Sequence, residues 1–443
     1  MSCRRGRVAT AGLVSALVLA ATACGTENAG LGAPTTSPAS NTVAGASAAS
    51  GTPTVASSVK APPTTASGPL GAPNKASGDA IAIGYIGDGQ SATIDSSADL
   101  LAAKASVAYA NDYLGGVAGR PIKLMTCETH QDAAQATACS NQLASSGVLA
   151  VLVNVSGQMS AIAKPLQEAK VPLFVWQGAD IASDPNSTFV FSNGIASIVH
   201  PATVARAEGF TRAAILVIDV PAAAGAAKAL GVPLLAKAGA TAEVTAIAAG
   251  AKDMMTPVQQ ALTKNPQIVH LIGDAEFCTG ALEALAAAGY TGTITAISQC
   301  IDDKTISFLG SYLKGLRVSY TATVDPTDPD YKRFVEVIDK YADGNKISLT
   351  STPVGAYGVV ATFSRAMAGA TGDITRSSMI DTVRSLGPLP LTMGSGLTFK
   401  CGANAVAILP AICTSGFLEA TLDASGQPTH FTAVEPGDLM TLG

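Results

Sequence analysis

The sequence contains few charged and few aromatic side chains: of 443 residues, 13% are charged and 5% are Phe, Trp or Tyr. A typical soluble domain is about 25% charged. The net charge of −5 offers no basic face, which excludes a nucleic-acid partner. Beyond the N-terminus there is no run of about 20 apolar residues, which excludes several membrane spans. No G-x-S-x-G, P-loop or His-x-x-x-His pattern occurs, so the sequence predicts no enzyme, no metal and no cofactor.

The first 24 residues have the pattern of an export signal. Three arginines precede an apolar stretch over residues 8–21, which is too short for a membrane helix. Small residues then lead directly into Cys24, and this ending resembles a bacterial lipobox. The pattern predicts a signal peptide over residues 1–23 and a lipid on Cys24, which would anchor the protein outside the cytoplasm to the cell membrane. An ordinary secretory signal with an incidental cysteine is the alternative.

Residues 24–78 differ from the rest of the chain in composition. They are mostly Ala, Ser, Thr, Pro and Gly, and their charged side chains are Glu27, Lys60 and Lys75. Prolines break helices and strand ladders, and such a segment buries too little apolar area to offset its ordering entropy. We expect a disordered stalk between the membrane and the folded part.

The cysteines after Cys24 fall into three couples that are close in sequence. Exported proteins favour disulfides, and a metal site would need closer ligand pairs such as C-x-x-C. We therefore expect structural bridges within the couples, which are Cys127 with Cys139, Cys278 with Cys300, and Cys401 with Cys413.

From residue 80 onward, short β-rich runs alternate with Ala-rich amphipathic runs. Strands are predicted at 80–86, 121–126, 148–153, 172–176, 213–218, 242–247, 268–272, 293–297 and 316–320. Helices are predicted at 97–114, 133–145, 160–169, 257–264 and 276–288. This alternation predicts parallel sheets in two doubly wound α/β lobes. The run 398–422 has hairpin-like strands and no helix.

Several motifs resemble those of type I periplasmic binding proteins of the Leu/Ile/Val-binding group. Ile83-Gly84-Tyr85-Ile86-Gly87 followed by a long helix, and Gly115-Gly116-Val117-Ala118-Gly119-Arg120, resemble the family's first βα unit. Other matching motifs are Gly250-Ala251-Lys252-Asp253, the helix from Asp330 to Tyr341, and Ala356-Tyr357-Gly358-Val359. The resemblance implies two Rossmann-like lobes joined by a three-crossover hinge. The expected lobes are residues 80–200 with 325–397, and 201–324 with 398–443.

The resemblance also implies a function. Such proteins are extracytoplasmic receptors of ABC importers, which bind a small polar solute by closing two lobes around it and deliver it to a membrane permease. We expect an amino acid or a related carboxylate or amide as the solute, and a monomeric protein. A ligand-sensing or protein-docking lipoprotein with the same fold and no transport role is the alternative.

Candidate ligand residues follow from the same resemblance. Ser156 takes the place of a serine that binds the solute carboxylate, although it is also a good helix cap. Gln177, Gly178 and Ala179 match a stretch that holds the same group. Glu276, near Asp274, takes the place of the acid that binds an ammonium group, and either acid is also favoured at a helix start.

Two of the expected ligand loops depart from the family pattern. The loop that begins at Asp219 lacks the usual tyrosine, and the loop over 87–97 has no aromatic residue. Trp176, the only tryptophan, is a candidate replacement at the edge of the crevice, and Tyr357 is a similar case. A place in the core is the alternative for both.

Overall fold

The computed structural model describes residues 68–91, 95–342, 347, 351–403, 405–407 and 409–441. The expected signal peptide, Cys24 and the first part of the expected stalk lie outside the described residues. Residues 68–78 of that stalk run along the first lobe with fixed partners. The amides of Asn74 and Ala76 donate to the carbonyls of Asp112 and Asn111, at 3.1 and 2.7 Å. This stretch belongs to the folded part, because its backbone groups replace water with protein partners.

The first sheet has five parallel strands in the order β2-β1-β3-β4-β5. Their bounds are β1 Ile81–Gly87, β2 Ile122–Glu128, β3 Ala150–Val153, β4 Leu173–Val175 and β5 Thr188–Val190. Every residue of β3 and β4 is buried, whereas in the edge strand β2 only Ile122 is fully buried. The inner strands are continuously apolar because helices cover both of their faces.

The second sheet repeats the same order in β7-β6-β8-β9-β10 and adds two antiparallel strands, β13 and β14, beyond β10. The parallel strands are β6 Arg212–Ile218, β7 Thr241–Ile247, β8 Ile268–Ile272, β9 Thr293–Ile297 and β10 Arg317–Tyr320. The hairpin is β13 Phe417–Leu422 with β14 Pro428–Val434. A short separate pair joins β11 Leu389–Pro390 to β12 Thr398–Phe399.

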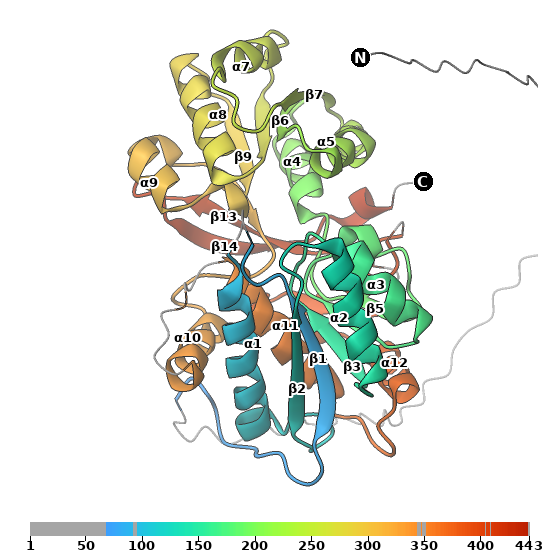
Figure 1. The fold of residues 1–443 in the computed structure, drawn as a ribbon. Coiled ribbons are helices and arrows are strands. Elements are labelled where there is room, and N and C mark those ends of the chain that lie inside the picture. Colours follow the sequence, from blue (N-terminus) through green and yellow to red (C-terminus); the bar gives the residue numbers. More distant parts are fainter. Residues whose placement is uncertain are drawn as a thin grey trace, which may run out of the picture. The chain divides into compact units, whose positions relative to one another are not determined.

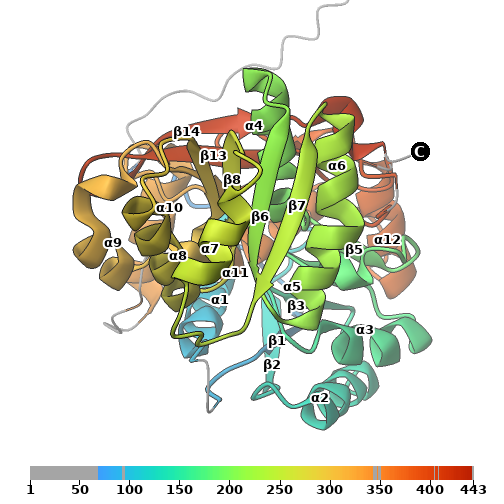
Figure 2. The same cartoon turned by 90° about the horizontal axis from the view of Figure 1, so that it is seen from above.

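Helices pack on both faces of each sheet (Figures 1 and 2). Those on the first sheet are α1 Ser97–Tyr109, α2 Ala133–Ser145, α3 Met159–Glu168, α10 Pro329–Tyr341, α11 Ser351–Met367 and α12 Arg376–Ser385. Those on the second are α4 Ala196–Glu208, α5 Pro221–Ala226, α6 Val232–Lys237, α7 Met255–Leu262, α8 Ala275–Ala287 and α9 Asp303–Leu309. Of these described helices, none has both the length and the apolarity that a membrane span requires.

The chain passes between the two sheets three times. It leaves the first sheet after β5, returns after β10 and leaves again after β12. Two of these crossovers are bonded to each other where the Asn193 side chain donates to the Ser415 carbonyl. The predicted α/β fold with two doubly wound lobes is therefore confirmed.

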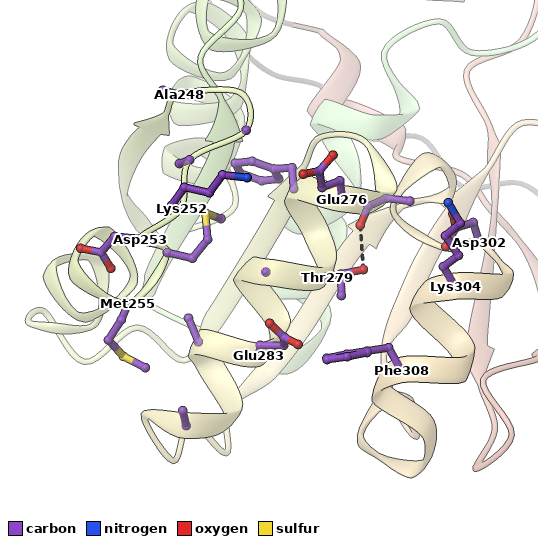
Figure 3. A pocket seen from close by; sticks show the side chains of 18 residues that line it. Ala248, Lys252, Asp253, Met255, Glu276, Thr279, Glu283, Asp302, Lys304 and Phe308 are labelled. Carbon is purple, nitrogen blue, oxygen red and sulfur yellow. Dashed lines mark hydrogen bonds between the residues drawn. The ribbon is translucent and has the colours of Figure 1, made fainter. Parts of the chain in front are cut away.

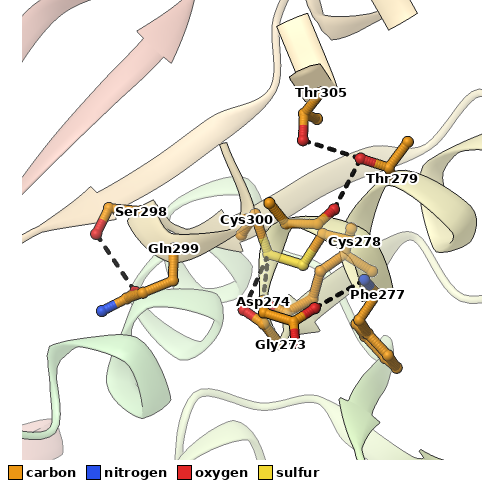
Figure 4. The surroundings of a disulfide bond; sticks show 12 residues. Gly273, Asp274, Phe277, Cys278, Thr279, Ser298, Gln299, Cys300 and Thr305 are labelled. Atoms are coloured by element: carbon orange, nitrogen blue, oxygen red, sulfur yellow. Dashed lines mark hydrogen bonds between the residues drawn. A yellow bond between two sulfur atoms is a disulfide. The ribbon is translucent and has the colours of Figure 1, made fainter. Parts of the chain in front are cut away.

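The three predicted disulfides are present: Cys127–Cys139, Cys278–Cys300 and Cys401–Cys413. The second bridge joins the first turn of α8 to the short 3₁₀ turn Ser298–Cys300 that follows β9 (Figure 4). Next to it, the hydroxyls of Thr279 and Thr305 lie 2.9 Å apart and connect α8 to α9. The bridge therefore helps to hold the helices that follow β8 and β9 in place.

The sequence pattern did not reveal β5, which spans only Thr188–Val190. The C-terminal hairpin also begins later than expected, at Phe417. Short strands give too few positions for a period of two to stand out from loop sequence.

The helix α11 packs closely on the first sheet because it carries Gly358 opposite the Trp176 ring. A Cβ at Gly358 would lie 2.8 Å from a ring carbon of Trp176. Gly358→Ala is therefore expected to destabilise the protein by about 1–3 kcal/mol through overpacking, as measured by urea unfolding. Gly225→Ala in α5 is the matched control, since its Cβ would meet open space. That helical substitution is expected to be neutral or to stabilise by up to about 1 kcal/mol. Equal effects of the two substitutions would contradict the packing argument.

Candidate functional site

The two sheets share one strand order, in which the second strand of the lobe lies on one side of the first strand and the third lies on the other side. The place between the first and third strands, where the connections diverge to opposite sides, is the switch point of each sheet. In the first lobe, Asp88 follows β1 and Ser156 lies in the loop after β3. In the second lobe, Asp219 follows β6 and Asp274 follows β8. In open parallel sheets, ligands bind at such points because neighbouring loops diverge beyond the carboxyl ends of the strands. These four residues therefore mark the candidate site.

Asp88 is the centre of a hydrogen-bond network on the first-lobe side. Its carboxylate is 5% exposed. Oδ1 accepts from the hydroxyls of Thr129 and Ser156 at 2.6 and 2.5 Å. Oδ2 accepts from the Gly157 amide at 3.1 Å and from the Gln131 side chain. Both oxygens thus have two donors each, which satisfies the lone pairs of the carboxylate.

Ser156 has the two hydrogen-bonding roles that suit a helix start. It donates its proton to Asp88 and accepts the Gln158 amide at 3.0 Å, one residue before α3. The resemblance assigns Ser156 to a solute carboxylate, and in the structure the carboxylate at Ser156 is that of Asp88. Sequence reasoning missed Asp88, although an acid directly after the first strand of a parallel sheet was a signal.

A second polar cluster is formed by Asn154, which directly follows β3, and Asp99 of α1. The Asn154 amide donates to Asp99 Oδ2 at 2.8 Å and to the Thr352 carbonyl at 2.9 Å. It therefore joins the loop after β3 to the first turns of α1 and α11. Burial raises the pKa of Asp99 to about 6; the Asn154 hydrogen bond opposes this rise, and the charge of Asp88 adds to it. These hydrogen bonds hold the loop after β3 in place against α1 and α11.

The loop after β4 carries three of the predicted ligand residues. The Gln177 amide donates to the Asn154 carbonyl at 3.0 Å, so this loop lies next to the loop after β3. Gly178 is buried, and Ala179 begins a 3₁₀ turn, Ala179–Ile181. The structure thus brings Gln177–Ala179 beside the loop that contains Ser156.

Trp176 and Tyr357 lie in the core of the first lobe. Each side chain is 1% exposed. The Trp176 ring lies against Gly355 and Gly358 of α11, and the Tyr357 ring packs 5.4 Å from that of Phe334. In this structure both side chains have the core position that the sequence left as the alternative, and Trp176 directly precedes the loop of Gln177.

On the second-lobe side, the predicted residues are exposed. Asp219 is tied to its neighbours by its amide, which donates to the Ile247 carbonyl at 2.8 Å. Asp274 caps α8 by accepting the Phe277 amide at 2.9 Å. Glu276 lies in the first turn of the same helix. Asp219 and Glu276 thus follow neighbouring strands, as expected for one side of a ligand site.

Glu276 also lines a surface pocket of about 750 Å³ between α7, α8 and α9 (Figure 3). Figure 3 shows Glu276, Thr279 and Glu283 along α8, with Phe308 on one side and Lys252 on the other. All residues that line this pocket come from the second lobe, so it does not bring Glu276 together with Ser156. Over the described part of the chain, no cluster of His, Cys, Asp and Glu is arranged to hold a metal ion.

Comparison with known proteins agrees with this arrangement. No curated protein matches the chain by sequence. Its structure is similar to a leucine-binding protein from Thermotoga maritima, with a TM-score of 0.62, 18% identity, and 81% of this chain and 99% of that chain covered. It is also similar to a branched-chain amino acid transporter substrate-binding protein from Streptococcus pneumoniae in complex with isoleucine (TM-score 0.61, 15% identity, 81% and 100% covered).

A further similar structure is an R. palustris solute-binding protein in complex with 4-hydroxybenzoate, with a TM-score of 0.63, 17% identity, and 81% of this chain and 97% of that chain covered. At these identities the likeness establishes the fold. The sequence profile described as "Periplasmic binding protein" matches residues 80–408, which is most of the chain. The resemblance seen in the sequence motifs is thereby confirmed, and the chain belongs to the periplasmic binding protein family.

Proposed function

We propose that this protein is the extracytoplasmic substrate-binding protein of an ABC importer, and that it binds a small polar solute, an amino acid or a related carboxylate or amide, between its two lobes. Proteins of this family bind small solutes. The observation that carries the proposal is the pair of switch points, which gather Asp88, Ser156, Asp219 and Asp274 at the carboxyl ends of two sheets.

The proposed mechanism is hinge closure. A solute that contacts loops of both lobes stabilises the closed arrangement, because only that arrangement makes both sets of contacts. The proposed contacts come from the loops that carry Ser156 and Gln177–Ala179 in the first lobe, and from Asp219 and Glu276 in the second. Trp176, which directly precedes Gln177, positions that loop from the core, and Tyr357 packs against Phe334 in the core. A permease in the membrane would then recognise the closed form.

The proposed boundaries follow the sequence expectations. Residues 1–23 are a signal peptide, Cys24 carries the lipid anchor, and the protein acts as a monomer on the outer side of the membrane. The lobes comprise residues 80–200 with 325–397, and 201–324 with 398–443. Three crossovers between the sheets support a hinge between these parts.

A thermal-shift screen against amino acids, small amides, amines, sugars and carboxylates tests the proposal. A solute at 100 times its dissociation constant is expected to add about 2.7 kcal/mol of stability and to raise the unfolding midpoint. Gln177→Ala and Asp219→Ala, one in each lobe, are expected to weaken the binding of any hit. Glu283→Gln, in the middle of α8, is the control and should leave binding unchanged. If no solute raises the midpoint of the folded protein, the sensing or docking role replaces import.

A further inference from the structure

Four hydrogen-bond donors surround the Asp88 carboxylate. We call them the donor cradle: the Thr129 hydroxyl, the Gln131 side-chain amide, the Ser156 hydroxyl and the Gly157 backbone amide. They come from the loop after β2 and the loop after β3, whereas the carboxylate that they surround comes from the loop after β1. Donors converging from separate loops on two oxygens form an arrangement suited to an anion.

Backbone hydrogen bonds and a close approach at Gly157 hold the loops of the donor cradle together. The amides of Thr129 and His130 donate to the carbonyls of Gly87 and Asp88, each at 2.9 Å, which ties the loop after β2 to the end of β1. Gln131 has a left-handed backbone, with φ of 63°, and its side-chain oxygen would lie 2.5 Å from a Cβ at Gly157. Gly157 therefore lacks a side chain where Gln131 must pass to reach Asp88.

The occupied donor cradle has an electrostatic consequence. Its four donor groups are all directed at Asp88, and the charge of Asp88 would repel a second carboxylate. Asp219, Asp274 and Glu276 add negative charge after the strands of the second lobe. His130 follows β2 and Lys252 follows β7, and each is accompanied by an acid, Asp132 and Asp253. Lys252 lines the separate pocket on α8. The loops at the two switch points thus favour a neutral or cationic solute.

We propose that Asp88 permanently fills the donor cradle, so that the site selects solutes with an amide, hydroxyl or amine at this end and discriminates against a free carboxylate. Asp88 is then a specificity-determining residue. The selectivity part of this inference rests on the proposed solute-binding function, whereas the occupation of the donor cradle can be tested without any solute.

The first experiment empties the donor cradle in the full-length protein. Asp88→Ala is expected to lower the unfolding midpoint, and sodium acetate or formate at about 100 mM is expected to restore several degrees of it by placing a carboxylate among the same donors. Sodium chloride at equal ionic strength controls for salt, and wild type should not respond. Asp423→Ala is the matched variant, because the Asp423 carboxylate accepts three hydrogen bonds in the turn between β13 and β14, outside any cradle. If acetate raises the unfolding midpoint of both variants, or of neither, the proposal that Asp88 fills the donor cradle is overturned.

The second experiment compares probes that differ only in one group: leucine with leucinamide, isobutyrate with isobutyramide, and benzoate with benzamide. For any pair that binds, wild type is expected to bind the amide at least tenfold more tightly. Asp88→Asn, which keeps the size and removes the charge, should reduce this ratio at least fivefold, and it also serves if Asp88→Ala does not fold. Glu283→Gln, which removes a charge in the middle of α8, is the matched control and should keep the preference for the amide.

The results distinguish a failure of the proposed selectivity from a failure of the proposed solute binding. A carboxylate that binds wild type more tightly than its amide, and whose binding is lost in Ser156→Ala, overturns the selectivity. If no probe and no other solute binds, solute binding itself has failed, while the acetate result still decides whether Asp88 occupies a carboxylate position.

Discussion

Replacement of Trp176 by alanine is expected to lower the free energy of unfolding by about 3–5 kcal/mol. Trp176 is among the largest fully buried side chains, with 1% of its surface exposed. Its ring fills the space between the end of β4 and the backbone of α11, where Cβ atoms at Gly355 and Gly358 would come within 2.9 and 2.8 Å of ring carbons. The substitution leaves a cavity that α11 cannot close, because its other contacts with α1 and the sheet hold it in place.

Urea unfolding followed by circular dichroism measures this loss, since Trp176 is the only tryptophan and the fluorescence signal disappears with it. Trp176→Phe keeps part of the ring volume and should cost less. Phe308→Ala is the control, because Phe308 is 69% exposed and should change stability by no more than about 0.5 kcal/mol. A Trp176→Ala protein of nearly normal stability that no longer binds solute would place Trp176 in the site instead of the core.

The fold was predictable from sequence because its signals are local. Apolar runs such as 150–153 and 268–272, each followed by an amphipathic stretch, predict buried parallel strands with helices between them. The cysteine couples were also predictable, since their partners are 12, 22 and 12 residues apart. These features depend on neighbours in sequence, so a single chain reveals them.

The site was only partly predictable, because its contacts join distant segments. Ser156 was singled out by the family resemblance, whereas its partner Asp88 lies 68 residues earlier. The strand order that makes them neighbours is set by tertiary packing, and no spacing rule encodes it. The same limit applies to Trp176, whose burial depends on two glycines of a helix about 180 residues away.

Acidification is expected to destabilise the second lobe through a buried histidine. His270 lies in β8 and is 1% exposed. The Ser197 carbonyl can only accept, so Nε2 of His270, 2.7 Å away, carries the proton, and Nδ1 lies 2.8 Å from the Thr295 hydroxyl. Burial, together with the neighbouring His200, lowers the pKa of His270 to about 3. The folded protein therefore keeps this imidazole neutral.

The direction of the pH effect follows from the unfolded chain, where a histidine has a pKa near 6.5. Below pH 6.5 the unfolded chain binds a proton at His270 that the folded chain does not bind, so stability is complete above pH 6.5 and is lost as the pH falls toward 3. At about 1.36 kcal/mol for each pKa unit, His270 accounts for a loss of up to about 3 kcal/mol by pH 4.

Two neighbouring groups, His200 and Glu419, act in the same direction as His270. Burial also lowers the pKa of His200, whose Nε2 lies 2.7 Å from Glu419. Burial alone would raise the pKa of Glu419, but hydrogen bonds from His200 and Arg317 outweigh it and lower that pKa. The stability that Glu419 contributes is therefore complete above its unfolded pKa of about 4.5 and is lost only at lower pH. Asp99 acts in the opposite direction, because its folded pKa of about 6 lies above its unfolded value, so its protonation stabilises the folded protein as the pH falls below 6. The contribution of His270 is therefore read from the difference in slope between wild type and a variant that lacks this imidazole.

Urea unfolding at several pH values between 7.5 and 4 measures this dependence. His270→Gln removes the titrating group while keeping a side chain that can hydrogen-bond to Ser197 or Thr295, so its stability should fall less steeply than that of wild type between pH 6.5 and 4.5. His430→Gln is the control, because His430 is exposed on β14 and its loss should leave the slope unchanged. A His270→Gln protein with the wild-type slope would show that another group causes the acid sensitivity.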